Sequence, residues 1–349
     1  MSAPRAERIL LLRAGTRVAL PLRARSLLWS VLLLMALLVA AAATLSLGKL
    51  GIPLAELPAA LLEPPRGAAG FTLGTLRGPR LVVALGVGAA LGISGALFQT
   101  VTRNPLGSPD VIGLGAGAGA GVALTGVAWP GVIPTPVGAL LGATLAITVV
   151  YLATGRGFSS PTRIIIAGIG VAAMASAVTQ YVVTITLRDE AAQLAGYLAG
   201  SINASSWGSA GLILLVLAVT WPAAAALTPR LNLMELGDSL AQSLGGRTRS
   251  TRTLAIIIAV IAAAGAVTVS GPIAFIALTA PQIARRLVRS PGVSLGLSAL
   301  IGALIMVLAD LIAQQAGWAK GLPVGVITAG VGGIYLGYLL LREWRKGLL

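Results

Sequence analysis

Hydrophobic residues along this chain are gathered into long runs, and short polar stretches with arginine, proline or Gly-Ser pairs separate them. A helix that spans a lipid bilayer needs about 20 mostly apolar residues, so each run of that length predicts one spanning helix. We expect about ten, at residues 27–47, 81–101, 110–129, 133–154, 164–187, 207–228, 253–270, 271–288, 293–315 and 324–341. The third and eighth have the least sharp limits, because glycine-rich or proline-broken stretches adjoin them. The pattern predicts an all-α, polytopic membrane protein.

Arginine and lysine fall mainly in alternate loops, which indicates how the helices are oriented. Cytoplasmic loops of membrane proteins retain these residues, and an N-terminus inside the cell makes every predicted inner loop basic. The basic residues left outside are Lys49, Arg66, Arg77, Arg80, Arg188 and Lys320. We therefore expect a multi-pass protein of a bacterial plasma membrane with both termini in the cytoplasm.

Residues 1–26 precede the first apolar run and are rich in arginine. They could be read as the start of a signal peptide, but the apolar run that follows is long enough to span the membrane. The polar segment before this run is also longer than the usual N-terminal region of a cleaved signal peptide. We expect a basic cytoplasmic arm at 1–26, attracted to lipid, and a single transmembrane domain at 27–345.

Composition narrows the possible chemistry. The chain of 349 residues is 56% hydrophobic and only 10% charged, and it contains no Cys and no His. It therefore has no thiolate or imidazole for a metal site, a haem pocket or a His-containing catalytic triad. The net charge of +15 is divided among loops between apolar runs, which favours the anionic cytoplasmic leaflet over nucleic acid as its partner.

Several sequence blocks occur in an order that is typical of one transporter family. These blocks are LRGPR at 76–80, RNPLGSPD at 103–110, SSPTRIIIAGIG at 159–170, LGDSLAQSLG at 236–245, GPIAFIALTAPQIARR at 271–286 and LPVGVITAGVGG at 322–333. Over 27–345 the chain resembles the FecCD-type permeases, the membrane subunits of iron-siderophore and vitamin B12 ABC importers. The amino-acid sequences of two of these blocks are most similar to those of permeases for ferric enterobactin.

The resemblance implies a type II ABC importer permease that carries a ferric siderophore inward by alternating access. It also implies four partners: a cytoplasmic ATPase dimer, a second permease subunit, the same or related, an extracytoplasmic substrate-binding protein, and membrane lipid around the helices. Cobalamin or haem stays open as the substrate. The chain itself has no G-x-x-x-x-G-K-[ST] phosphate loop, so ATP hydrolysis must come from another polypeptide.

The Asn-Pro-Leu sequence at 104–106 is a candidate gate. Pro105 forbids continuation of a helix and frees backbone groups, which Asn104 can cap while Leu106 projects as an apolar plug. The resemblance to B12 permeases implies that Asn104 and Leu106 line the cytoplasmic gate and that Thr162 lines a second layer. On residue types alone, an ordinary cytoplasmic turn remains the alternative.

Arg77 and Arg80 lie on the outer side, against the general trend of the basic residues. The resemblance implies that they receive carboxylates from the two lobes of the substrate-binding protein. Pairing with phospholipid headgroups is the alternative. Gln314 stands where the B12 pattern has a third docking arginine, so we expect weaker or different docking contacts.

The longest inner connection, about 229–252, contains a candidate coupling helix. Met234–Leu244 predicts a short amphipathic helix with leucines at four-residue spacing, ended by two glycines. The resemblance implies that this helix docks into a cleft of the ATPase through Leu236, Gly237, Asp238, Leu240, Ala241, Leu244 and Gly245. A helix lying on lipid is the alternative, although acidic residues suit an anionic surface poorly.

Asp310 lies inside the ninth predicted helix, where a carboxylate is costly and is usually paired or functional. An ion-coupled secondary transporter would use it, which is the main rival function. We favour a structural acid satisfied by Gln314 and helix-terminal amides. A polytopic membrane enzyme is a weaker rival, because we find no set of acid, base and nucleophile; we expect no catalytic residue, metal site or cofactor. Gln282 and Gly321 also depart from the family pattern, at positions with no known chemistry.

Overall fold

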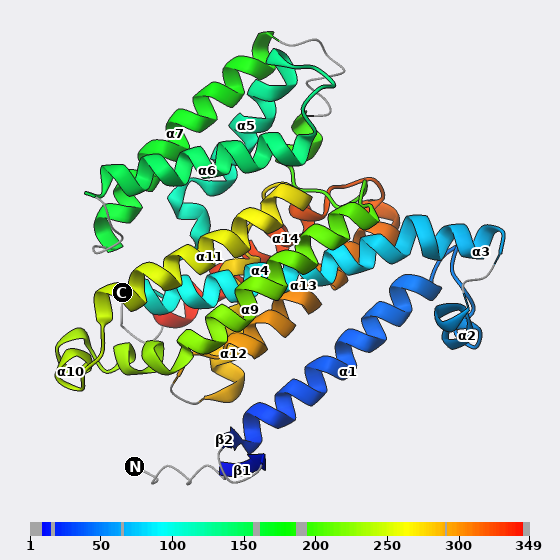
Figure 1. Ribbon diagram of the computed structural model, residues 1–349. Coiled ribbons are helices and arrows are strands. Elements are labelled where there is room, and N and C mark those ends of the chain that lie inside the picture. The colour runs from blue at the N-terminus through cyan, green and yellow to red at the C-terminus, as the bar shows by residue number, and fades with distance from the viewer. Residues whose placement is uncertain are drawn as a thin grey trace.

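The computed structural model describes residues 9–14, 18–63, 66–155, 161–185, 194–289 and 292–344. It is a helical bundle with one small hairpin at its N-terminal end (Figure 1). The elements before the central helix are β1 (Ile9–Ala14), β2 (Val18–Arg23), α1 (Ala24–Ser46), α2 (Leu57–Leu62), α3 (Ala68–Phe71) and the π-helical η1 (Thr72–Arg77). The elements that follow are α4 (Gly78–Thr102), η2 (Pro109–Ile112), α5 (Leu114–Ala128), α6 (Thr135–Ala153), α7 (Pro161–Ile185), α9 (Trp207–Glu235), α10 (Asp238–Ser243), α11 (Thr248–Ser270), α12 (Ile276–Val288), α13 (Leu295–Gln315), η3 (Gly317–Ala319) and α14 (Val324–Trp344).

Each predicted membrane span corresponds to a helix, so the all-α fold class is confirmed. Seven helices within the described ranges are long and apolar enough to cross a membrane, and Leu114–Ala128 and Val324–Leu339 are shorter apolar helices. The eighth span begins later than expected, at Ile276 instead of 271. Gly271 and Phe275 both have φ of +70°, a backbone conformation that a helix does not contain.

The N-terminal arm differs in part from the expectation. β1 and β2 pair antiparallel, with Ile9 opposite Arg23 and Ala14 opposite Val18. The helix α1 follows directly at Ala24. Both strands are short, continuous apolar runs, ILLL at 9–12 and VALPL at 18–22. The sequence-based expectation of a basic arm rested on the density of arginine around them.

The helix α4 forms the centre of the molecule. Pro79 lies in its first turn, where a missing N–H costs nothing, and its middle contacts α9, α11, α12 and α13. Gly88 lies against Gly302 of α13, where a Cβ on either residue would come within 2.3 Å of the other's carbonyl oxygen. Small residues at such contacts let backbones approach closely in lipid, where packing holds helices together.

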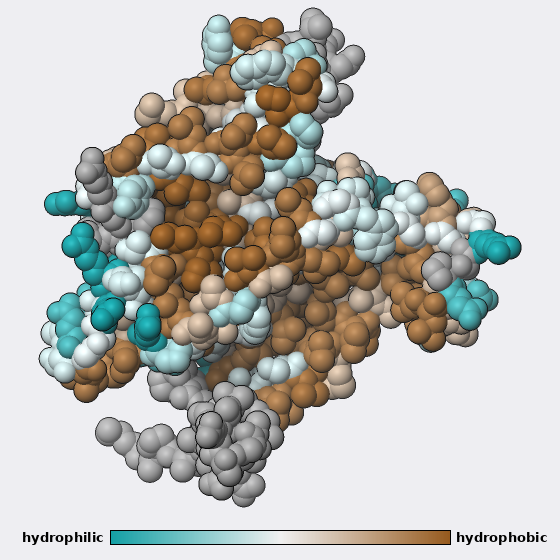
Figure 2. Space-filling model, viewed as in Figure 1, coloured by the Kyte–Doolittle hydropathy of each residue, from teal (hydrophilic) through white to brown (hydrophobic). Residues whose placement is uncertain are grey.

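The two ends of the molecule are polar and its middle is apolar. The start of α1, α10 and the last turns of α14 lie at one end, whereas α2 and α3 lie at the other (Figure 1). Figure 2 shows hydrophobic side chains over the middle of this face, with hydrophilic side chains at both ends. An apolar band between two polar ends is the surface expected of a multi-pass membrane protein.

Candidate functional site: an Asn-Pro-Leu turn, a short helix and two ion-paired clusters

The chain turns sharply between α4 and η2, and we call residues 103–106 the Asn-Pro-Leu turn. Arg103 ends α4 in the left-handed conformation, with φ of +49°. The Oδ1 atom of Asn104 accepts a hydrogen bond of 2.9 Å from the backbone N–H of Leu106. Asn104 therefore closes the turn, and the Leu106 side chain is left 46% exposed.

The helix α12 holds this turn from the other side. The Nε2 atom of Gln282 donates a hydrogen bond of 2.7 Å to the carbonyl of Pro105. In the last turn of the same helix, Arg285 donates to the Oε1 atom of buried Gln99, whose Nε2 atom donates to the carbonyl of Leu278 at 2.9 Å. No role for Gln282, Gln99 or Arg285 follows from the sequence, because their partners are remote in the chain.

Two cavities lie beside the turn and share Asp110 and Ala274 as lining residues. One, of about 280 Å³, is lined by Leu106, Ser108, Asp110, Val111, Ala274, Phe275, Leu278 and Leu336. The other, of about 460 Å³, adjoins α5 and α14 and is lined mostly by small and apolar residues. Thr162 is exposed in the first turn of α7 and is not among the residues that line either cavity.

The candidate coupling helix is shorter than the sequence predicted. Met234 and Glu235 belong to the last turn of α9, which continues through Pro229, and α10 begins only at Asp238. Gly237, with φ of +107°, separates the two helices. A residue with a side chain is strained there, so this glycine explains why one predicted helix is two.

Three leucines of this segment remain uncovered. Leu236, Leu240 and Leu244 are 57%, 48% and 59% exposed, whereas Ala241 is fully buried against the bundle. The helix ends in a glycine motif, in which Gly245 donates to Gln242 and Gly246 donates to Ala241. α10 thus presents an apolar patch at a polar end of the molecule.

Asp238, the first residue of α10, lies between two arginines. Its Oδ1 atom is 2.6 Å from Nη2 of Arg103, and its Oδ2 atom is 2.9 Å from Nη2 of Arg252. The hydrogen bond from Arg252 and the positive charges of both arginines lower the pKa of the Asp238 carboxyl group, although partial burial opposes them. The carboxylate is therefore ionised at neutral pH.

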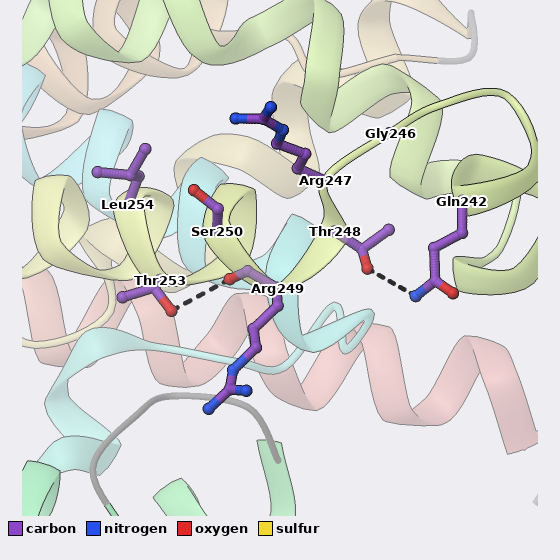
Figure 3. A pocket seen from close by; sticks show the side chains of 8 residues that line it. All are labelled: Gln242, Gly246, Arg247, Thr248, Arg249, Ser250, Thr253 and Leu254. Carbon is purple, nitrogen blue, oxygen red and sulfur yellow. Dashed lines mark hydrogen bonds between the residues drawn. The ribbon is translucent and has the colours of Figure 1, made fainter.

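The connection between α10 and α11 is open and basic (Figure 3). A hollow of about 600 Å³ is lined by Gln242, Gly246, Arg247, Thr248, Arg249, Ser250, Thr253 and Leu254. The Nε2 atom of Gln242 donates to the hydroxyl of Thr248 at 2.9 Å and so ties α10 to α11. Arg247 and Arg249 extend away from each other in the figure.

At the opposite end, both predicted docking arginines have partners inside the protein. Nη1 of Arg77 donates to the carbonyls of Thr44 and Leu45 at 2.9 and 3.1 Å. Arg80 binds Asp310 through Nε and Nη2, at 2.9 and 2.6 Å from Oδ1.

Asp310 has a second partner on its own helix. The Nε2 atom of Gln314 donates to Oδ2 of Asp310 at 2.7 Å, the partner that the sequence suggested. The sequence did not suggest Arg80, which lies 230 residues away. Elsewhere in the described ranges, no group of three or more acidic side chains is gathered so that it could hold a metal ion.

Comparison with known proteins decides the family. Residues 32–342 match the model of the FecCD transport family. The chain belongs to the FecCD transport family. The resemblance of its sequence blocks is thereby confirmed, and FecCD members are ABC transporter permease subunits that are not enzymes themselves.

Two curated relatives of this FecCD permease cover most of its length. The ferric enterobactin transport system permease protein FepG of Escherichia coli is 39% identical over 327 residues, which is 92% of this chain and 98% of that protein. The cobalamin import system permease protein BtuC of Halobacterium salinarum is 34% identical over 279 residues, which is 78% of this chain and 74% of that protein.

A solved structure described as a metal-chelate type ABC transporter in an inward-facing conformation is also similar. Its TM-score is 0.79 at 25% identity, and the match covers 90% of this chain and 98% of that one. Family and fold together support an ABC importer permease, whose function requires ATPase and substrate-binding partners.

Proposed function

We propose that this chain is the permease subunit of an ABC importer that moves a ferric siderophore into a bacterial cell by alternating access. The observation that carries the proposal is the apolar patch of Leu236, Leu240 and Leu244, exposed on a short helix at a polar end of a FecCD permease. An exposed apolar patch marks a surface that another protein or a membrane covers, and the acidic residues of this segment suit an anionic membrane surface poorly. An ATPase subunit is the partner that this family requires.

The proposal that the substrate is an iron chelate rests on the similarity to known permeases. Identity to the ferric enterobactin permease is 39% over nearly the whole chain, against 34% over a shorter match to the cobalamin permease. The iron(III)-citrate permease YfmE of Bacillus subtilis is 35% identical over 79% of this chain. Cobalamin and haem remain alternatives for the test below.

The gate is proposed at the Asn-Pro-Leu turn. Leu106 projects beside a cavity whose other wall includes Leu336 of α14. α14 also leaves Val331, Ile334 and Tyr338 exposed, so a second permease subunit facing α14 would complete the path. Thr162, at the start of α7, would line a second layer of this gate.

Docking of the substrate-binding protein is proposed at Arg77. Its hydrogen bonds to the end of α1 use only Nη1, so Nη2 and Nε are left to meet a carboxylate. Arg80 is bound at two points by Asp310, so a docking role for Arg80 requires that it share or exchange this partner. We propose accordingly that both termini and α10 lie in the cytoplasm.

The contact between Arg80 and Asp310 argues against the rival function, an ion-coupled carrier. A carboxylate that takes up and releases a driving ion has to be free of a permanent counter-charge during part of the cycle. Asp310 is 1% exposed and is held by Arg80 and Gln314.

Transport into proteoliposomes tests the proposal. The permease is reconstituted with its ATPase and binding protein, and uptake of a ferric catecholate, ferric citrate, cobalamin and haem is compared with and without ATP. We expect ATP-dependent uptake of a ferric chelate and none with a hydrolysis-deficient ATPase. Uptake driven by an ion gradient without ATP would contradict the ABC assignment, and uptake of cobalamin or haem alone would contradict the substrate.

A further inference from the structure

The carboxylate of Asp238 binds two arginines of the permease, although 39% of the Asp238 side chain and 46% of the Arg103 side chain stay exposed. Both of its oxygens are taken, Oδ1 by Arg103 at 2.6 Å and Oδ2 by Arg252 at 2.9 Å. Arg103 is the first residue of the Asn-Pro-Leu turn, and Arg252 lies in the first turns of α11 with only 12% of its side chain exposed. One acidic side chain therefore joins α10 to the turn and to a spanning helix.

The contact to Arg103 is geometrically constrained. The same Nη2 atom that bonds Asp238 also donates a hydrogen bond of 2.8 Å to the carbonyl of Met234, at the end of α9. The backbone of Arg103 is left-handed, which fixes the direction in which its side chain leaves α4. A displacement of α10 would therefore pull on Arg103, and through it on the turn that carries Leu106.

The far side of the turn is anchored independently. Gln282 of α12 holds the carbonyl of Pro105 at 2.7 Å. The turn thus has one support on α12 and a second one, through Arg103, that is shared by α10 and the end of α9. A segment held in this way can be tilted when one of its two supports moves.

Asp238 could alternatively serve α10 alone. A carboxylate in the first turn of a helix interacts favourably with the helix dipole, and an exposed one could pair with a cation of the ATPase. Neither role requires two arginines from other elements, and each oxygen of the carboxylate already accepts a hydrogen bond from one of them. The ATPase-facing surface is formed instead by the exposed leucines.

We propose that Asp238 is a positioning residue that transmits movement of α10 to the Asn-Pro-Leu turn through Arg103, with Arg252 as the fixed support. This inference rests on the proposed function, because it requires that an ATPase moves α10. Asp238 acts through Arg103 and does not touch the substrate. Its loss uncouples ATP hydrolysis from transport and leaves the ATPase bound.

The test compares Asp238→Asn and Arg103→Gln with the wild type in proteoliposomes that contain the ATPase and the binding protein. Two quantities are measured: the amount of ATPase that co-purifies, and the number of substrate molecules taken up per ATP hydrolysed. We expect unchanged co-purification and a fall of roughly fivefold or more in uptake per ATP for each variant, the range of ordinary coupling between sites. Glu235→Gln removes the same charge three residues away and is the matched control, with uptake per ATP within about twofold of the wild type.

Two more variants separate coupling from a merely structural role. The defects of the double variant Asp238→Asn/Arg103→Gln are expected to be smaller than the product of the two single defects, because both changes break the contact between Asp238 and Arg103. Asp238→Glu, which keeps the charge, is expected to recover most of the uptake per ATP. If one single variant does not fold, the other and Asp238→Glu still decide the question.

The outcomes that overturn the inference are distinct from those that overturn the proposed function. Unchanged uptake per ATP in Asp238→Asn, loss of the ATPase from that variant, or a double variant whose defects multiply would each overturn the inference alone. A wild-type permease that binds no ATPase would overturn the proposed function and this inference with it.

Discussion

The guanidinium of Arg80 binds the carboxylate of Asp310 through two nitrogen atoms, at 2.6 Å for the shortest contact, and so ties α4 to α13. Asp310 is 1% exposed and the Arg80 side chain 18%. Planar two-point pairing of this kind compensates a charge that is otherwise costly inside a membrane protein. The intramembrane acid is therefore explained as part of the helix packing.

Removing one partner of this pair tests its structural role. Asp310→Ala leaves Arg80 largely buried without its counter-charge, and we expect the free energy of unfolding to fall by about 3 kcal/mol, the lower end for buried pairs because Arg80 is partly exposed. Denaturant unfolding in detergent measures it. The double variant Arg80→Met/Asp310→Leu is expected to recover most of the loss. A single variant as stable as the wild type would contradict the pairing.

Charge reversal at Arg77 tests docking without disturbing that pair. Arg77→Glu is expected to abolish stimulation of the ATPase by the binding protein while basal hydrolysis is kept, because a carboxylate would then face a carboxylate. Raising the salt concentration should weaken wild-type stimulation, since exposed charges are screened over about 8 Å at physiological ionic strength. Arg66→Glu reverses another exposed charge on the same side and is the control. Normal stimulation in Arg77→Glu would refute the docking assignment.

The close contact of α4 with α13 gives a third prediction. Gly88→Ala brings a methyl group to 2.3 Å from the carbonyl oxygen of Gly302, so the helices must separate. We expect a loss of about 1–3 kcal/mol in the free energy of unfolding, the usual effect of overpacking. Gly170→Ala on α7 meets no atom within 4 Å and should cause no loss. Equal stability of the two variants would contradict the packing described.

The sequence predicted the spanning helices well because length and hydropathy decide them locally. It predicted α10 poorly, since the break depends on the φ angle of Gly237, and a leucine spacing of four continues across that break. It also could not pair Arg80 with Asp310, or Arg103 with Asp238, because 230 and 135 residues separate the partners. Arg103 is the first residue of the RNPL motif, but only the fold shows that it binds Asp238.

An ABC permease needs α10 to bind an ATPase, whereas an ion-coupled carrier does not. Two variants distinguish these functions experimentally. Leu240 is 48% exposed in the apolar patch, so Leu240→Asp would place a charge in the ATPase cleft and cost several kcal/mol of association, on the order of a binding hot spot. The control is Gln242→Glu, which adds the same charge about 200° around α10 and can still accept a hydrogen bond from the hydroxyl of Thr248. Asp310→Asn keeps the shape of the intramembrane acid and removes its charge.

The most direct measurement is ATPase co-purification and ATP-driven uptake in Leu240→Asp and Asp310→Asn at matched expression. Our account predicts that Leu240→Asp loses both, that Gln242→Glu keeps both, and that Asp310→Asn retains substantial ATP-driven uptake per folded molecule. Normal transport by Leu240→Asp, together with a dead Asp310→Asn that is still folded, would contradict the account.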